Sequence, residues 1–434
     1  MRTAFKIEPG ELRATLLSFF FMLTLMASYY LLRPIRDAMS SNWTDAELST
    51  LFSATFLFSI LAVMLYGAAC SRIRFSRMVP GVYGLFAASF VGFFLAVGSI
   101  DDAEWARKSF YVWISVFSLF HVSVFWSYMA DIFSRDQAPR LFGFIAAGAS
   151  IGAILGPAIA VTMVGAIGTS NLLLISASLL MIPIVVISSL EKERRQPDSS
   201  LDAQPGQQQA IGGNPFAGFS LFLKNPYLLA IGCFILLYTA LSTFVYFELK
   251  NLLAGVEEVT RVKIWAGMDL AVNVLAIGTA MFGTSRLTTR FGLTTTLVLV
   301  PVLIVFGLLI VAIAPMIGVV VGLQVIRRAG NYAITRPGRE MLFTIVDRET
   351  RFKAKSVIDI VVYRGGDAAT AWAFTGLTQG LGLGLGAVAA VGAVLAVLWS
   401  FLALFLGRSY MKSTTEQDAK ETLHEKRNGE NNER

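Results

Sequence analysis

The sequence predicts an all-α integral membrane protein with about 12 transmembrane helices, arranged as two parallel six-helix repeats. The first observation is composition: of the 434 residues, 55% are hydrophobic and 15% are charged, and the mean hydropathy is +0.64. Soluble domains are about 25% charged. The second observation is a series of long apolar stretches. The third is a repeat of basic loops at about half the chain length.

Twelve stretches are long enough to cross a bilayer, which requires about 20 mainly apolar residues. These stretches are 12–36, 48–69, 79–100, 110–133, 142–164, 170–190, 227–250, 262–284, 293–314, 316–336, 356–378 and 383–407. They predict an N-terminal six-helix half (1–190) and a C-terminal half (227–407). Residues 191–226, rich in Gln, Gly, Pro and Ser, form a cytoplasmic linker, and the polar tail 408–434 is expected to be disordered and cytoplasmic.

The loop charges predict that both termini are cytoplasmic, because Lys and Arg then concentrate in the cytoplasmic loops. The net charge of +7 therefore does not indicate nucleic-acid binding. The first apolar run is too long for a cleavable signal, so we interpret it as the first span. Cys70 and Cys233 lie in or beside spans, and no disulfide framework is implied.

Basic loops recur at a nearly constant offset. Arg72 and Arg286 follow the second and eighth spans and lie 214 positions apart, while Arg135 and Arg348 follow the fourth and tenth spans and lie 213 apart. Two matches at almost one offset favour two parallel six-span halves, with a binding site near the middle of the membrane between them.

The first of these loops reads Gly67-x-x-x-Ser71-Arg72, and its counterpart reads Ser285-Arg286 with Met281 at the position of the glycine. Both are similar to the Gly-x-x-x-Asp-Arg-x-Gly-Arg-Arg pattern of the major facilitator superfamily. The resemblance implies that the loops at Arg72, Arg286, Arg135 and Arg348 latch helix ends and gate the inner face.

Two adjacent arginines, Arg327 and Arg328, occupy the middle of the apolar run between Pro315 and Pro337. A charge at this depth costs about 2.5–3.5 kcal/mol on insertion scales, so the pair faces protein or a water-filled cavity. The functional interpretation is an anion pathway, because guanidinium groups offer fixed donors to anionic oxygens. The alternative is a structural ion pair with an acid on a neighbouring helix.

Polar side chains also form stripes on single helix faces in the tenth and eleventh spans. The tenth carries Gln324, Arg327, Arg328, Asn331 and Thr335, and the eleventh carries Asp359, Tyr363, Asp367 and Thr370, with Arg364 on its flank. The two aspartates can simply neutralise the arginines, although the arginines outnumber them. Gly365-Gly366 allows a bend or a close approach of another helix.

Other polar groups in the spans have two interpretations each. Arg33 and Arg36, beside Tyr30 and Asp37, point inward from a kink at Pro34 or snorkel to the outer surface. His121 shuttles protons or is a hydrogen-bonded core residue. Three further groups are Asp269, expected to face the cavity, and Glu248 and Lys250, which can form an interfacial pair.

Three longer motifs carry a more specific resemblance. The first is Tyr29-Tyr30-x-Leu-Arg33-Pro-Ile-Arg36-Asp37. The second is Phe125-Trp126, followed by Arg135, Ala138, Arg140-x-Phe142 and the glycine run 148–156. The third is Lys353-x-Lys355-x-x-Ile358-Asp359, which leads to Arg364-Gly365-Gly366. Together they resemble the nucleotide (ATP/ADP) exchange transporters of obligate intracellular bacteria and plastids and their relatives in free-living bacteria. The resemblance implies a twelve-span exchanger in a bacterial inner membrane. Ile114 stands where the exchangers carry an acid, so the substrate within this class stays open.

The favoured function is secondary active transport of an anionic phosphorylated solute, with nucleotide (ATP/ADP-type) exchange by alternating access as its specific form. The expected substrate-binding residues are Arg327, Arg328, Arg364, Arg33, Arg36, Asn331 and Tyr30. The expected charge-balancing or coupling residues are Asp359, Asp367, Asp269, Asp37, His121, Glu248 and Lys250. We expect no cofactor or metal, no nucleic-acid partner, and a monomer in the bilayer.

A non-transporting signalling or scaffold protein is disfavoured, because the mid-membrane pair Arg327 and Arg328 would be a needless cost to it. Two further functions are alternatives. The first is a proton-coupled facilitator transporter of another organic anion, an organophosphate, a lipid or a drug, using His121, Asp359 or Asp367. The second is a membrane enzyme acting on lipid-linked phosphate. The enzyme is disfavoured because the chain has two histidines, no metal-ligand spacing and no glycine-rich phosphate loop.

Overall fold

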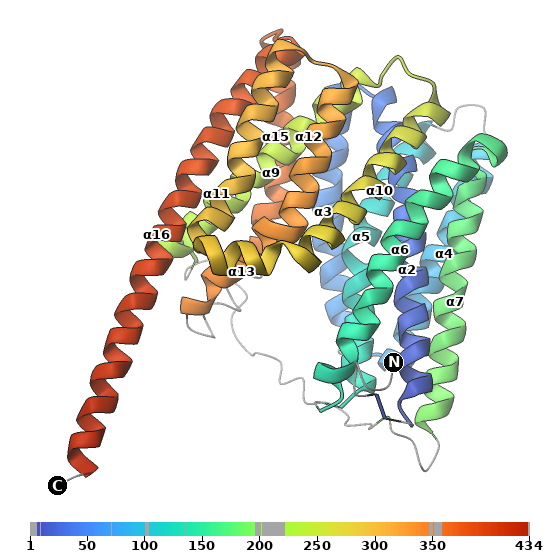
Figure 1. The fold of residues 1–434 in the computed structure, drawn as a ribbon. Coiled ribbons are helices and arrows are strands. Elements are labelled where there is room, and N and C mark those ends of the chain that lie inside the picture. Colours follow the sequence, from blue (N-terminus) through green and yellow to red (C-terminus); the bar gives the residue numbers. More distant parts are fainter. Residues whose placement is uncertain are drawn as a thin grey trace. The chain divides into compact units, whose positions relative to one another are not determined.

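The computed structural model describes residues 7–8, 10–70, 72–99, 104–134, 136–195, 201, 222–346, 350 and 358–432. Every regular element in these ranges is helical, as predicted. Ten of the helices are long and apolar enough to cross a membrane. Figure 1 shows these helices as long rods.

Contacts between Cα atoms divide the chain into two units, which are described separately. Unit 1 comprises Met1–Gly212 and Lys250–Val274, and unit 2 comprises Gly213–Leu249 and Leu275–Arg434. The segment Lys250–Val274, which follows the linker in the sequence, therefore packs with the N-terminal helices. It contains the end of one helix and most of the next.

Unit 1 contains all of the predicted N-terminal spans together with part of the C-terminal ones. Its elements are α2 (Leu12–Met39), η1 (Ser40–Asn42), α3 (Asp45–Cys70), α4 (Phe75–Ser99), α5 (Glu104–Ile132), α6 (Ala138–Ile167), α7 (Asn171–Arg194), the end of α9 (Pro226–Leu252) and most of α10 (Glu258–Phe282).

Helix α2 is the central helix of unit 1, with α5, α6 and α7 packed against it (Figure 1). Its contact with α6 depends on glycines at four-residue spacing. A Cβ atom on Gly152 would lie 2.2 Å from the Leu23 carbonyl oxygen, and one on Gly156 would lie 2.5 Å from that of Ala27. Small residues at this spacing let two helix backbones approach closely.

The start of α2 is fastened to the start of α6 by an ion pair. Arg140 donates to both carboxylate oxygens of Glu11, at 3.1 and 2.8 Å, and Gln137 Nε2 donates to Oε1 at 3.0 Å. Burial raises the pKa of Glu11, but hydrogen bonds from Arg140, the Glu8 N–H and Gln137 outweigh it, so the pKa is lower than usual. The ionised form is the one that holds these two helices together.

Unit 2 contains the remaining helices. Its elements are the main part of α9, the end of α10, α11 (Thr284–Ile313), α12 (Ile317–Gly330), η2 (Asn331–Thr335), α13 (Arg336–Leu342), η3 (Phe343–Ile345), η4 (Ile358–Gly365), α15 (Gly366–Thr375), η5 (Gly376–Gly380) and α16 (Leu385–Asn432). Figure 1 shows α16 beside α11 and continuing past its end. Helix α16 continues to Asn432, so the described part of the tail 408–434 is helical, where the composition led us to expect disorder.

The two predicted spans that are absent from the ten long helices are interrupted by π-helical segments. The tenth runs through α12, η2 and α13, and the eleventh through η4, α15 and η5. In the tenth, Pro337 lacks the N–H that an α-helix would donate to Ala333, and the widened turn directly precedes it. Single π-helical turns inside helices occur frequently at functional sites.

Candidate functional site

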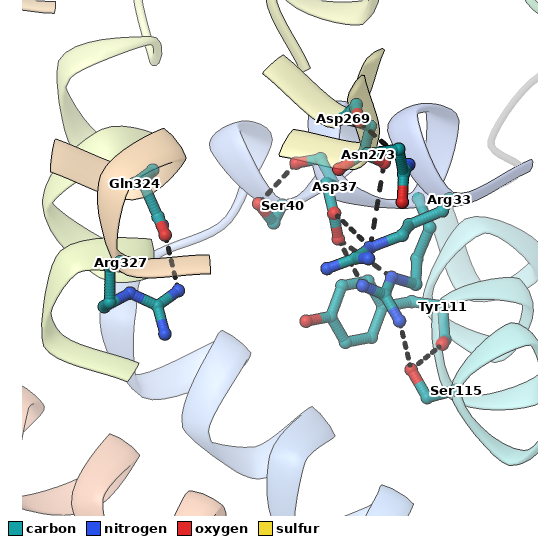
Figure 2. A network of polar contacts seen from close by, with 10 residues as sticks. Arg33, Asp37, Ser40, Tyr111, Ser115, Asp269, Asn273, Gln324 and Arg327 are labelled. Atoms are coloured by element: carbon teal, nitrogen blue, oxygen red, sulfur yellow. Dashed lines mark hydrogen bonds and ion pairs between the residues drawn. The ribbon is translucent and has the colours of Figure 1, made fainter. Parts of the chain in front are cut away.

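Unit 1 places two arginines and two aspartates in one buried cluster, shown in Figure 2. Arg36 Nη2 lies 2.5 Å from Asp37 Oδ1. Arg33 Nε lies 3.7 Å from Asp37 Oδ2 and 3.8 Å from Asp269 Oδ2. The arginines come from consecutive turns of α2, and Asp269 comes from α10.

The cluster is almost closed to solvent. The side chains of Arg33 and Arg36 are 17% and 14% exposed, and those of Asp37 and Asp269 are 2% and 1% exposed. The two arginines therefore point into unit 1. Their two positive charges face two carboxylates, so the four residues are formally neutral.

Helix α5 completes the surroundings of Arg36. Arg36 Nη1 donates to Ser115 Oγ at 3.3 Å, and its guanidinium lies 5.5 Å from the centre of the Tyr111 ring. Arg33 lies 5.9 Å from the ring of Tyr30, another residue predicted for the site. Aromatic faces stabilise cations at such distances, so both arginines are held by charge and by rings.

A second polar cluster in unit 1 joins the end of α9 to the start of α3. Lys250 is 1% exposed, and its Nζ lies 2.7 Å from Asp45 Oδ1 and 2.8 Å from the Trp43 carbonyl oxygen. Asn251 Nδ2 donates to Asp45 at 3.1 Å. Next to them, Arg261 Nη1 donates to Asn42 Oδ1 at 2.7 Å. Lys250 therefore forms a buried ion pair with Asp45, which links the end of α9 to the start of α3.

Local sequence explains why Asp45 lies there. Thr44 and Glu47 form a capping box at the start of α3: the Thr44 N–H donates to Glu47 Oε2 at 2.9 Å, and the Glu47 N–H donates to Thr44 Oγ1 at 3.2 Å. The box sets the first turn of α3 and with it the position of Asp45. Sequence reasoning missed Asp45, although the Thr-Asp-Ala-Glu signal was readable.

In unit 2, Arg327 is buried among neutral groups. Its side chain donates from Nη2 to Gln324 Oε1 at 2.5 Å and from Nη1 to the Tyr238 hydroxyl at 3.4 Å. The guanidinium also lies 5.7 Å from the Tyr238 ring centre. The residue is 3% exposed, and its Nε is buried without a hydrogen bond. Among the described residues, no carboxylate forms an ion pair with Arg327. Figure 2 shows the contact with Gln324.

The other predicted residues of unit 2 lie on the same elements or face them. Arg328 and Asn331 are buried on α12 and η2. Arg364 lies near the end of η4 and is half-buried. Asp367, in the first turn of α15, accepts a hydrogen bond from Thr243 Oγ1 at 3.3 Å. Glu248 is buried near the end of α9.

Gly366, at the junction of η4 and α15, permits close packing against α9. A Cβ at this position would lie 2.9 Å from Leu236 Cδ1. The close approach expected at Gly365-Gly366 is therefore present.

One arginine of unit 2 was missed. Arg339, on α13, is 7% exposed, donates to the hydroxyl of Tyr363 and pairs with Glu340 at 3.2 Å. In the sequence it lies three residues beyond the predicted end of the tenth span at position 336. It continues the polar stripe of Asn331 and Thr335 by a further four residues, and that periodicity is the signal that could have found it.

Several predicted residues cannot be placed. Arg135 and Arg348 lie outside the described residues, and of Arg286 and Asp359 only the backbone is described. Arg72 is exposed in the turn after α3. With Ile73, Arg74 and Arg77 it lines a shallow basic depression.

The comparisons with known proteins agree on the fold. A crystal structure of a mutant of the nucleoside transporter NupG is 14% identical, with a TM-score of 0.61 over 92% of this chain and 99% of that chain. A bacterial homologue of the human lysosomal transporter Spinster, in an inward-facing and unoccupied conformation, is also 14% identical, with a TM-score of 0.57 over 94% and 98%. A comparison with curated proteins found no match.

The sequence profile of the Major Facilitator Superfamily matches residues 15–338, about three quarters of the chain. The all-helical architecture and the ten apolar helices agree with this match. The chain therefore belongs to the Major Facilitator Superfamily and is a multi-pass membrane protein with the fold of its transporters.

Proposed function

We propose that this protein is a secondary active transporter of an anionic phosphorylated solute, and that it exchanges nucleotides of the ATP/ADP type by alternating access. The single observation that carries the proposal is the environment of Arg327. Its buried guanidinium is surrounded by Gln324 and Tyr238, which are neutral, and its Nε makes no hydrogen bond.

The comparison with unit 1 explains why this environment indicates a ligand. Arg33 and Arg36 are only 17% and 14% exposed, but Asp37 and Asp269 compensate their charges. Burying an ion without a partner costs several kcal/mol. An anionic solute beside Arg327 would offset that cost, and phosphate oxygens suit the planar guanidinium donors.

The remaining residues have supporting roles in this proposal. Arg328, Asn331 and Arg364 would add donors to the phosphate in unit 2. In unit 1, Asp37 and Asp269 would hold Arg33 and Arg36 when no substrate is bound and release them to an anion. Asp359, Asp367, Glu248 and Lys250 would balance charge during the cycle.

A labelled-substrate assay tests the proposal. Proteoliposomes preloaded with ADP should take up labelled ATP, and uptake should require the internal ADP. Arg327→Gln should lower kcat/KM for ATP by about tenfold or more, because a hydrogen bond to a charged group is worth about 1.5–3 kcal/mol. Arg408→Gln, which changes an exposed arginine on α16, is the matched control and should leave uptake unchanged.

A further variant separates substrate binding from a structural ion pair. If Arg327 only neutralised Asp359, the double variant Arg327→Gln/Asp359→Asn would recover the activity lost in Arg327→Gln. We expect no recovery. Uptake that ignores internal ADP and follows an imposed pH gradient would instead support the proton-coupled transporter.

A further inference from the structure

We infer that Tyr29 and His121 form a subsite for a planar ring that carries an N–H donor, such as the base of a nucleotide. This inference rests on the proposed function and adds recognition of the base to it. Tyr29 and His121 lie in unit 1, and neither is assigned to binding the phosphate in the proposed function.

The first support is the hydrogen bonding of His121. The residue is 4% exposed in the middle of α5. Its Nδ1 lies 3.2 Å from the Phe117 carbonyl oxygen, an acceptor, so Nδ1 carries the proton. In the neutral ring Nε2 is then an acceptor. Nε2 is buried and has no hydrogen-bond partner among the described residues. A buried polar atom without a partner costs free energy and calls for an explanation.

The second support is the aromatic setting of this atom. The imidazole lies 4.5 Å from the Tyr29 ring with an interplanar angle of 31°, and 5.3 Å from the Phe117 ring with an angle of 36°. The backbone beneath it is fixed, because the Tyr83 hydroxyl donates to the His121 carbonyl oxygen at 2.9 Å. Tyr29 is the partly exposed member of the stack. A rotation of the Tyr29 side chain would open space beside the imidazole, in which a base could stack on the Tyr29 ring and direct its N–H to Nε2.

The third support is the register of this stack with the arginines. On α2, Tyr29 precedes Arg36 by seven residues, and on α5, His121 follows Ser115, the partner of Arg36, by six. Both helices therefore separate the aromatic group from the arginine by about 10 Å at 1.5 Å per residue. The base and the phosphates of one nucleotide can span this distance. A bare phosphate is too short to contact both the aromatic group and the arginine.

Three probes of graded chemistry test the inference by equilibrium binding to the full-length protein in nanodiscs. They are ATP, purine riboside 5′-triphosphate, which lacks the amino group and has no ring N–H, and inorganic tripolyphosphate. For the wild type we expect ATP to bind about 3- to 10-fold more tightly than purine riboside triphosphate, the gain of one hydrogen bond. Tripolyphosphate should bind most weakly.

Two variants separate the hydrogen bond from the stacking. His121→Phe keeps a ring and loses the acceptor, so ATP and purine riboside triphosphate should bind equally. Tyr29→Leu should weaken both by about 10-fold, the scale of aromatic stacking on a base. Neither variant should change binding of tripolyphosphate, which also serves as the test of folding. An unchanged preference for ATP in His121→Phe would overturn the inference.

The outcomes also separate this inference from the proposed function. If the wild type binds all three probes equally, the phosphate site stands and the ring subsite is wrong. If the wild type binds none of them, both fail. If Arg327→Gln abolishes binding while His121→Phe retains the ATP preference, only the ring subsite fails.

Discussion

The buried arginines of this protein differ in what surrounds their charge. Arg33 and Arg36 are held by Asp37, Asp269 and aromatic faces, whereas Arg327 is held by an amide and a tyrosine. Truncating one member of a compensated cluster leaves an unpaired charge. Truncating Arg327 removes a charge that no described carboxylate compensates. Truncation within the compensated cluster should therefore lower stability by leaving a charge unpaired, whereas truncation of Arg327 should leave no unpaired charge behind.

A stability measurement on the unit 1 cluster checks the first half of this expectation. Asp37→Asn leaves two arginines facing Asp269 and should lower the free energy of unfolding by about 3 kcal/mol. Arg36→Gln/Asp37→Asn restores one charge of each sign and should recover part of the loss. Thermal unfolding of the purified variants measures both. Additive losses in the double variant would contradict the idea of a charge-compensated cluster.

At the scale of elements, the packing of α2 against α6 depends on the absence of side chains. The glycines of α6 lie directly on the backbone of α2, so the two helices behave as one rigid pair. In contrast, η2 and η4 interrupt their helices beside Arg328 and Arg364. Helix α2 is thus packed closely against α6, whereas the spans that carry the polar stripe of unit 2 contain π-helical turns.

One pair of variants in α6 tests the close packing. A Cβ on Gly152 would lie 2.2 Å from a backbone oxygen and 2.9 Å from Met26 Cβ, so Gly152→Ala should lower stability by about 1–3 kcal/mol. Gly143→Ala, in the same helix but with nothing within 4 Å, should raise stability by about 0.5–1 kcal/mol. Melting temperatures in detergent distinguish the two. Equal effects would mean that the helices separate easily.

At the scale of the whole molecule, unit 1 contains residues from both sides of the linker. Lys250, Asn251 and Arg261 fasten the connection between α9 and α10 to the junction of α2 and α3. If alternating access moves the predicted halves 1–190 and 227–407 against each other, as proposed, this connection would come apart in each cycle, because it joins residues of both halves. The buried pair of Lys250 and Asp45 would then set part of the barrier to opening.

A reversible cross-link tests this requirement. The side-chain polar atoms of Asn251 and Asp45 are 3.1 Å apart, so in Asp45→Cys/Asn251→Cys a short bis-methanethiosulfonate reagent should join the two thiols. The free cysteines Cys70 and Cys233 are first replaced by serine. Exchange by the double-cysteine variant should fall to background when the cross-link forms and return with reductant, each state being compared with the same protein before cross-linking. Full activity of the cross-linked protein would exclude opening at this point.

Much of the fold could be predicted from sequence because membrane insertion leaves few choices. Backbone groups in lipid must satisfy their hydrogen bonds within helices, so apolar runs of the right length predict spans directly. The repeat at Arg72 and Arg286 added the two-half organisation, and the facilitator fold is confirmed. The interruptions at η2 and η4 were not foreseen, since a π-helical turn depends on local strain and packing rather than on hydropathy.

The sequence by itself determined which charged and aromatic groups lie in the membrane, because each lies in an apolar run that must cross it. Only the tertiary structure decided which of them meet. Arg33 is separated from Asp269 by more than 200 residues, and so is Asp45 from Lys250. Helix periodicity orients a side chain on its own helix and carries no information about the neighbouring helix. Partner choice, and with it the contrast between Arg36 and Arg327, follows from packing.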